Sequence, residues 1–297
     1  MNALRLSAFA LCAFLVGNTF AQGQAYVKLG GGYGFPLASE HLGTNGRQEL
    51  TTSLDPNLGE VPRLITESEN IHGSYGAGIL INGSFGYMFT DQLGVEAMIS
   101  YFIGRRYDVT NSGLSKRLDN VLYDSRITLS TQGSGFFFAP MVKVAASSGK
   151  VQPYLMIGPV FGLLHFDRSQ QVVTYDAGFT STEYAAVEYR GGLAKGARGI
   201  AGAEMTITSS LRVFAEAIIT GMNYYPAKAE VTRWEANGTN FLGTLTTRER
   251  VVKFVSKVTT DSDLPIESES SPSRQSRFSL PLSSIAANVG LKWTFGH

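Results

Sequence analysis

The chain has 297 residues, with 25 basic and 24 acidic side chains, and only 16% of it is charged, against about 25% in ordinary soluble domains. This near-neutral balance argues against nucleic acid and against strongly acidic partners. No run of about 20 apolar residues follows the N-terminal segment, which argues against membrane-spanning helices. The chain is rich in glycine, with 33 residues, and 11% of it is aromatic.

Residues 1–21 have the pattern of a cleaved secretory signal peptide. Arg5 precedes an apolar run over residues 6–16, and Ala21 provides a small residue at a cleavage position. An amphipathic first helix is the alternative, but the segment has no polar face. A mature domain of residues 22–297 would lack the single cysteine, Cys12, and with it disulfide or thiol chemistry. It would carry 24 basic and 24 acidic residues.

Eight segments of the mature chain alternate apolar residues with small or polar ones, which is the pattern of strands whose two faces have different surroundings. These segments are residues 24–36, 75–89, 93–108, 129–145, 151–168, 197–208, 211–225 and 279–296. Short connections at 90–92, 147–150 and 209–210 alternate with long ones at 37–74, 109–128, 169–196 and 226–278. All short turns and both termini therefore fall at one end of the strands, which is typical of an exported barrel.

The longest connection, residues 226–278, has strand-like patterns of its own. Residues 228–234, the turn pair Asn237-Gly238 and residues 244–255 predict that the last two strands continue outward as a hairpin-like extension. The stretch 261–277 is rich in Ser, Pro and Glu, and we expect it to be mobile.

Residues 93–104 indicate which strand face meets lipid. One face is Leu93, Val95, Ala97, Ile99, Tyr101 and Ile103, and the other is Gly94, Glu96, Met98, Ser100, Phe102 and Gly104. A water-exposed face carries roughly 25–35% charged residues, so we interpret the second face as a crowded interior and the first as lipid-facing. An open sheet edge is not tolerated in lipid. The sequence therefore predicts an all-β fold, an eight-stranded antiparallel up-and-down transmembrane β-barrel with long extracellular loops.

Aromatic residues near the strand ends predict two girdles on the lipid-facing surface. They are Tyr87, Phe89, Trp293 and Phe295 at the turn end, and Tyr33, Phe35 and Tyr101 toward the loops. Segment 151–168 is apolar on both faces, so its facing stays open. Pro140 and Pro159 lack the N–H that a closed ladder needs, and they predict local distortions.

The inward faces place seven charged residues in the half of the barrel next to the short turns. They are Lys28, Glu96, Lys143, Glu204, Arg212, Glu216 and Lys292. An eight-stranded barrel is filled by side chains, and unpaired charges in its interior would be costly. We therefore favour a salt-bridged plug over a gate or proton path. Under this hypothesis, glutamine at positions 96 and 204 lowers stability and leaves single-channel conductance at background.

Motifs for catalysis or ligand binding are weak. Residues 30–34 are glycine-rich but lack the third glycine and the following helix of a dinucleotide site. Residues 165–169, His-Phe-Asp-Arg-Ser, contain the residue types of a Ser–His–Asp site without its geometry. The histidines at 41, 72, 165 and 297 have no metal-ligand spacing. We expect no catalytic residues, no metal and no cofactor.

The last strand is similar to the C-terminal insertion signal of the small outer-membrane β-barrel superfamily, the OmpA/OmpX/OmpW-like barrels. Val289, Leu291, Trp293 and Phe295 carry this resemblance, and the architecture extends it over nearly the whole mature chain. It implies recognition by the barrel assembly machinery, location in the bacterial outer membrane, contact with its lipid and lipopolysaccharide, and no peptidoglycan-binding domain. Members include structural barrels, adhesins, small-solute passages and a few lipid-modifying enzymes.

Because the long connections hold most of the charge, and loops commonly carry function, we expect a non-enzymatic barrel whose outer loops recognise a surface partner or shield the cell. Porin-like passage of small or hydrophobic solutes, through the lumen or a lateral opening at Pro140 and Pro159, is the alternative. An outer-leaflet lipid hydrolase or acyltransferase rests on His165 and nearby serines alone. A soluble lipocalin-like carrier is the non-membrane alternative.

Overall fold

The structure of the protein is a computed structural model, in which residues 23–37, 40–55, 59–116, 122–147, 149–176, 178–258 and 268–295 are described. The predicted signal peptide, residues 1–21, lies outside the described residues.

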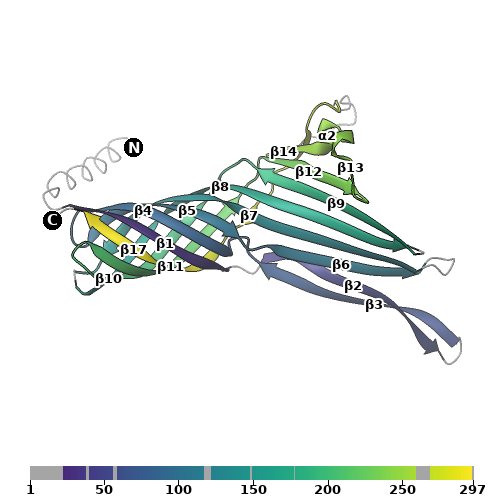
Figure 1. Cartoon of the computed structure of the whole chain (residues 1–297), viewed down its shortest axis with the longest axis horizontal. Coiled ribbons are helices and arrows are strands. Elements are labelled where there is room, and N and C mark those ends of the chain that lie inside the picture. Colours follow the sequence, from purple (N-terminus) through teal and green to yellow (C-terminus); the bar gives the residue numbers. More distant parts are fainter. Residues whose placement is uncertain are drawn as a thin grey trace, which may run out of the picture.

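Strands make up nearly all of the described fold (Figure 1). Their bounds are β1 (Gln24–Pro36), β2 (Glu40–Asp55), β3 (Gly59–Gly73), β4 (Gly78–Met88), β5 (Leu93–Gly104), β6 (Tyr107–Lys116), β7 (Leu122–Ala145), β8 (Val151–Asp176), β9 (Phe179–Arg190), β10 (Ala194–Thr206), β11 (Leu211–Tyr224), β12 (Lys228–Ala236), β13 (Thr239–Asn240), β14 (Val251–Val255), β15 (Ser273–Ser276), β16 (Leu280–Pro281) and β17 (Ser284–Phe295). Two short helices, η2 (Leu242–Thr244) and α2 (Thr247–Arg250), lie between β13 and β14.

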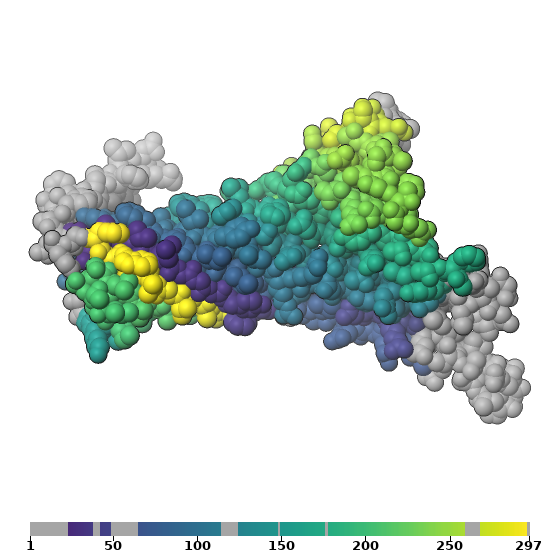
Figure 2. Space-filling model, viewed as in Figure 1, coloured from purple at the N-terminus to yellow at the C-terminus, as the bar shows by residue number. Residues whose placement is uncertain are grey.

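Eight strands close into a ring of antiparallel pairs. Going around the ring, β1 pairs with β4, followed by β5, β7, β8, β10, β11 and β17, and β17 pairs again with β1. The closing pair, β1 in purple and β17 in yellow, lies side by side on the surface in Figure 2. The prediction of an all-β chain with a closed ring of eight strands is confirmed. In the part of the chain that the structure describes, the sheet is larger than the ring, with 17 strands, and it includes the parallel pairs β2–β6 and β14–β15.

The short connections β4–β5, β7–β8 and β10–β11 lie at the end of the ring where β1 begins and β17 ends, which we call the turn end (Figure 1). Side chains alternate between the inside and outside of the ring, as the pleat of a strand requires. On β5, Met98 and Phe102 are buried inside, whereas Ile99 is exposed on the outside. The facing of residues 151–168 also becomes clear, because Tyr154 and Met156 point inward.

The predicted long loops are mostly strands that extend the sheet beyond the ring. Residues 37–74 contain the β2–β3 hairpin, and residues 169–196 contain the outer part of β8 and all of β9. This sheet extension runs in the order β3–β2–β6–β7–β8–β9–β12, with β13 and β14 next to β12 (Figure 1). Strands β7 and β8, with 24 and 26 residues, run from the ring into the extension.

The prediction of a hairpin-like extension in the last long connection is confirmed in part: β12 and β14 pair in antiparallel orientation, but they do not continue the last two strands of the ring. Strand β11 ends before Pro226, which cannot continue the hydrogen-bonded ladder, and β12 pairs with β9. The strand that was expected to follow it outward, β17, begins only at Ser284. Asn237 and Gly238 do form the predicted turn, with φ of 49° and 80°, which suits a tight hairpin.

Residues 261–277 were expected to be mobile. Within this stretch, Ser273–Ser276 form β15, which pairs in parallel with β14. Residues 261–267 lie outside the described residues.

The ladder between β7 and β8 is interrupted at two prolines. Phe138 pairs with Phe161 and Val142 with Ile157, so Pro140 and Pro159 lie directly opposite each other. Because neither proline has an N–H, the seam lacks the hydrogen bonds that these two positions would donate. On their other sides both prolines keep register partners, on β5 and β10.

Candidate functional site

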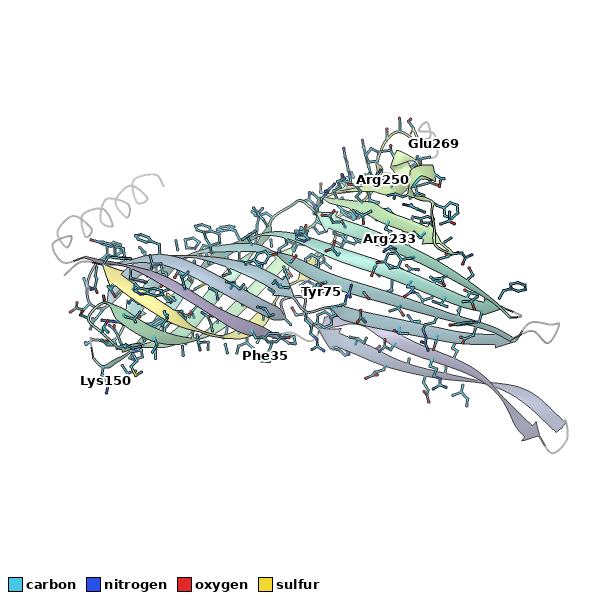
Figure 3. The ribbon with its side chains drawn as sticks, viewed as in Figure 1. Phe35, Tyr75, Lys150, Arg233, Arg250 and Glu269 are labelled. Atoms are coloured by element: carbon cyan, nitrogen blue, oxygen red, sulfur yellow. The ribbon has the colours of Figure 1, made fainter. Side chains whose placement is uncertain are left out.

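The seven charged residues singled out in the sequence all lie on inward-facing positions of the ring, near the turn end. Six are buried, and the seventh, Arg212, keeps 20% of its side chain exposed. They form two clusters, one around Lys28 and one around Glu204. Lys150, labelled in Figure 3, marks the turn end beyond them.

The first cluster surrounds Lys28. Its Nζ lies 3.2 Å from Glu96 Oε1 and also forms an ion pair with Glu216. The hydroxyl of Tyr26 donates to Glu96 Oε2 at 2.7 Å, and that of Tyr154 donates to Glu216 Oε1 at 2.7 Å. Each carboxylate therefore receives one charged donor and at least one neutral donor, an arrangement that offsets the cost of burying it.

The second cluster is centred on one carboxylate and three cations. Glu204 accepts from Lys292 at 2.8 and 3.0 Å, from Lys143 at 3.3 Å and from Arg212 at 2.7 Å. Arg212 also donates to Gln152 Oε1 at 2.8 Å. Among the described residues these three cations have no other ion-pair partner.

Two tyrosine rings connect the clusters. Lys292 Nζ lies 4.2 Å from the ring centroid of Tyr26, and Lys143 Nζ lies 4.1 Å from that of Tyr154. Because the face of an aromatic ring attracts a cation, these contacts stabilise the cluster in which cations outnumber carboxylates. We call the seven charged residues with Tyr26 and Tyr154 the interior network.

The interior network joins the strands across the ring. Its members come from β1, β5, β7, β8, β10, β11 and β17. The eighth ring strand, β4, connects through Asn82, which donates to Asn288 Oδ1 at 3.1 Å, and Asn288 donates to Glu216 Oε2 at 2.7 Å. Each of the seven charged residues has at least one ion-pair partner. The ion pairs and hydrogen bonds therefore cross-link the strands through the interior of the ring.

Sequence reasoning missed the two tyrosines and a buried arginine, Arg198. Arg198 Nε donates to Thr220 Oγ1 at 3.1 Å and its Nη1 to Ser100 Oγ at 3.1 Å. No carboxylate in the described part of the chain lies within ion-pair distance of it. The sequence did contain a sign that Arg198 faces inward, because Arg198 precedes Glu204 by six residues and so lies on the same face of the strand.

Aromatic side chains fill the other end of the ring. Phe166 stacks on Tyr224 with ring centroids 5.5 Å apart, and Tyr75 packs edge-on against Phe166 at 5.5 Å. Tyr75 lies where the ring meets the sheet extension (Figure 3). With buried Phe102 and Phe137 below this layer, side chains occupy the interior from the turn end to the extension.

The histidine motif does not assemble a triad. His165 Nε2 lies 2.9 Å from the hydroxyl of Ser134, its cross-strand partner on β7, rather than from Ser169. No carboxylate hydrogen-bonds to His165 within the described ranges. Among described residues there is also no group of three or more side chains suited to hold a metal ion. No described helix has the length and apolarity to cross a membrane.

The four residues of the predicted insertion signal lie on the outer face of β17. Val289 and Phe295 are 63% and 55% exposed, Leu291 is also exposed, and Trp293 is half-buried. No protein-family model matches the chain, and no curated protein matches it. The closed ring, its charged interior and its outer face are therefore the features from which a function is inferred.

Proposed function

We propose that the chain is a non-enzymatic outer-membrane β-barrel protein with a structural or surface-recognition role. In this proposal residues 1–21 direct export, the ring spans the bacterial outer membrane, and the sheet extension faces outward and recognises a partner. The ring then contacts lipid and lipopolysaccharide, and the outer face of β17 provides the signal for the barrel assembly machinery.

The inverted polarity of the ring carries this proposal. Its charged side chains point inward, except Lys195 near the extension, whereas large apolar side chains are exposed on the outside, among them Leu29, Ile81, Phe85, Ile99, Phe136, Leu155, Ile157 and Val289. Soluble monomers rarely expose an apolar patch larger than a few hundred Å². Such a surface around a closed ring fits hydrocarbon as its surroundings, because closure leaves no unpaired strand edge.

Strand length and aromatic placement also support a membrane location. Strands β4, β5 and β17 have 11 or 12 residues, and about 9–11 are enough to cross a bilayer at a tilt. Tyr87 and Phe89 contact each other edge-on at the turn end, and Tyr33 and Phe35 do so at the other end. Figure 3 shows Phe35 at that rim.

The sheet extension has a different surface, which supports its exposure to water. Glu230 pairs with Arg190, with Lys228 at 2.9 Å and with Arg250 at 3.2 Å. Arg233 and Arg250 lie on this extension in Figure 3. The hydrogen bond from Lys228, with the two arginine charges, lowers the pKa of Glu230. Paired surface charges of this kind are normal in water and would be costly in hydrocarbon.

Spin labelling in lipid vesicles tests the proposal. Single cysteines replace Val289 and Leu155 on the ring and, as the matched water-exposed control, Arg233 on the extension. We expect labels at 289 and 155 to be relaxed by oxygen, which concentrates in lipid, and the label at 233 by a water-soluble nickel chelate. Relaxation of the labels at 289 and 155 by the chelate would overturn the proposal.

Passage of small or hydrophobic solutes is the second candidate, and the interrupted β7–β8 ladder favours a lateral route. An apolar groove of about 430 Å³ lies on the outside of the ring at this seam, next to Pro140 and Pro159. Replacing both prolines with alanine allows the missing hydrogen bonds to form. If solutes pass here, cells that carry the double-alanine variant should take up an apolar dye more slowly than cells that carry the parent protein. Unchanged uptake would remove this candidate.

A further inference from the structure

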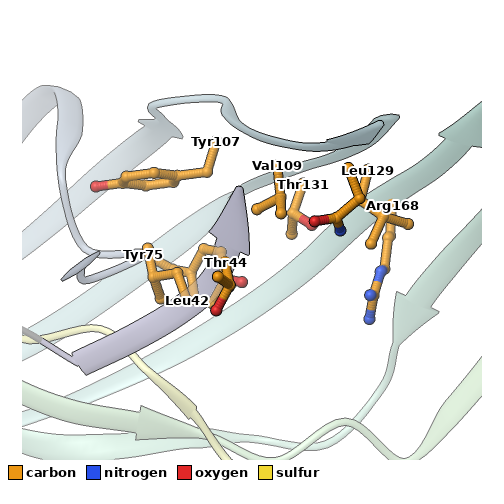
Figure 4. Close-up of a pocket in the computed structure, with 10 residues that line it drawn as sticks. Leu42, Thr44, Tyr75, Tyr107, Val109, Leu129, Thr131 and Arg168 are labelled. Atoms are coloured by element: carbon orange, nitrogen blue, oxygen red, sulfur yellow. The ribbon is translucent and has the colours of Figure 1, made fainter. Parts of the chain in front are cut away.

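A pocket of about 320 Å³ lies on the inner face of the sheet extension, above the aromatic layer that contains Tyr75 (Figure 4). Strands β2, β6, β7 and β8 and the segment before β4 supply its ten lining residues, none of which is acidic. Its polar and aromatic members include Thr44, Tyr75, Tyr107, Asn111, Thr131 and Arg168. Figure 4 shows Arg168 and Tyr107 toward opposite ends of the pocket.

Close approach of the β2–β3 hairpin to β6 builds one wall of this pocket. A Cβ atom added to Gly43 would come within 2.8 Å of Val109 Cγ2, so the absence of a side chain allows β2 to lie against β6. Gly73, at the end of β3, also allows close approach, because a Cβ atom added there would lie 3.1 Å from the ring of Tyr107 on β6. The opposite wall is the continuous sheet of β7 and β8, on which Thr131 and Arg168 are register partners.

Arg168 is exposed and has no ion pair or hydrogen bond from its guanidinium in the part of the chain that the structure describes. Its cross-strand neighbours, Thr131 and Val187, are neutral. By contrast, Arg190 and Arg250 on the same extension both pair with Glu230. The guanidinium of Arg168 is therefore available to an external anion, and its planar fork matches a carboxylate or a phosphate.

Two tyrosines add flat aromatic surface. Their rings meet edge-on with centroids 5.8 Å apart, and the Tyr107 hydroxyl donates to Ser74 O at 3.0 Å, which fixes the ring. Burial raises the pKa of Tyr75, and the nearby charge of Arg168 only partly opposes this rise. The phenol thus stays protonated at neutral pH and can donate a hydrogen bond. Hydroxyl and amide groups from Thr44, Thr131 and Asn111 complete the polar lining.

We propose that this pocket binds a saccharide unit that carries one anionic group. The guanidinium of Arg168 holds the carboxylate or phosphate, the tyrosine rings pack against the sugar, and the hydroxyl and amide groups bond to its hydroxyls. The ten described lining residues include no carboxylate to receive an ammonium group, which disfavours amino acids. The volume lies at the lower end of the range for small-molecule pockets, about 300–1,000 Å³. The inference rests on the proposed function, because it requires the extension to face outward.

Titration of the mature protein in detergent micelles tests the pocket. The probes are glucuronate, glucose 6-phosphate, neutral glucose and inorganic phosphate, and binding is measured by calorimetry. We expect at least one anionic sugar to bind. Glucose, which lacks the charged hydrogen bond, and inorganic phosphate, which lacks the contacts to the sugar, should each bind more weakly by about 10-fold or more. Comparing glucuronate with glucose 6-phosphate distinguishes carboxylate from phosphate recognition.

The Arg168→Gln variant should lose about 10-fold to 100-fold in affinity, whereas Arg190→Gln, on the neighbouring strand, should bind like the parent protein. Absence of binding by both anionic sugars, equal binding of inorganic phosphate, or unchanged affinity in Arg168→Gln would overturn the inference. Because titration in micelles does not depend on membrane insertion, such a failure would leave the proposed function intact. The spin-label measurement tests that function separately.

Discussion

Glu204 is the carboxylate on which the charge balance of the interior network depends most. Lys143, Lys292 and Arg212 lie 2.7–3.3 Å from its oxygens. The Glu204→Gln substitution keeps the shape of the side chain and removes its charge. The three cations then have no ion-pair partner among the described residues, and two of them, the lysines, are buried.

The expected loss follows from that burial. Removing one partner of a buried ion pair costs about 3–5 kcal/mol, because the remaining charge stays desolvated. Arg212 contributes less, since 20% of its side chain is exposed and solvent screens it. We therefore expect Glu204→Gln to lower the free energy of unfolding by about 3–5 kcal/mol, a large part of the total stability of an ordinary domain.

Urea unfolding in lipid vesicles, followed by tryptophan fluorescence, measures this loss. The control is Glu235→Gln, which breaks the exposed pair with Arg233 and should leave the free energy of unfolding almost unchanged, because solvent screens exposed ion pairs. Combining Glu204→Gln with Lys292→Met removes one of the stranded cations and should recover part of the loss. A cost for Glu204→Gln no larger than that of the control would refute the reasoning. Single-channel conductance should stay at background, and a clear rise would favour a gate over a plug.

Three further predictions concern the seam, the extension and the buried arginine. Alanine at both Pro140 and Pro159 restores two donors, so hydrogen exchange of the flanking β7 and β8 amides should slow; unchanged exchange would contradict a hydrogen-bond gap. The pKa of Glu230 is lowered in the folded state, chiefly by the hydrogen bond from Lys228. The ionised Glu230 carboxylate therefore stabilises the fold at pH values above its unfolded pKa of about 4.3, and this stabilisation is lost as the pH falls through the folded pKa. Proteolysis of the extension should accordingly accelerate in acid, and Glu230→Gln should remove this dependence. Arg198→Met removes a buried charge without a carboxylate partner and should change the urea midpoint little or raise it; a loss like that of Glu204→Gln would contradict this.

The ring could be predicted from the sequence wherever the two faces of a strand differ in polarity. Strand β5 was assigned because Glu96 and the glycines oppose an aliphatic row. Strand β8 could not be assigned, because its inward residues Tyr154, Met156 and Val160 are as apolar as those that face outward. Where the inward-facing side chains are also apolar, the two faces of a strand cannot be distinguished by polarity.

The seven charged residues of the interior network could be predicted from the sequence, whereas its two tyrosines and the pairing of its members could not. The alternation of side chains along a strand identifies the residues that face inward. Their hydrogen-bond and ion-pair partners depend on the stagger between strands, which brings Tyr26 to Glu96 although they are 70 positions apart in the sequence. The pairing of β12 with β9 and of β2 with β6 depends on long-range register in the same way. The groups that line the pocket come together only through those pairings.

The length of β7 and β8 has a consequence for recognition. The same two strands that carry Lys143 and Tyr154 in the interior carry Thr131 and Arg168 in the pocket, so a cross-braced framework supports the site at the mouth. A ligand arriving there meets a wall that is already organised, and little backbone entropy is lost when it binds. In such a rigid receptor, contact energy is converted into affinity with a small conformational cost.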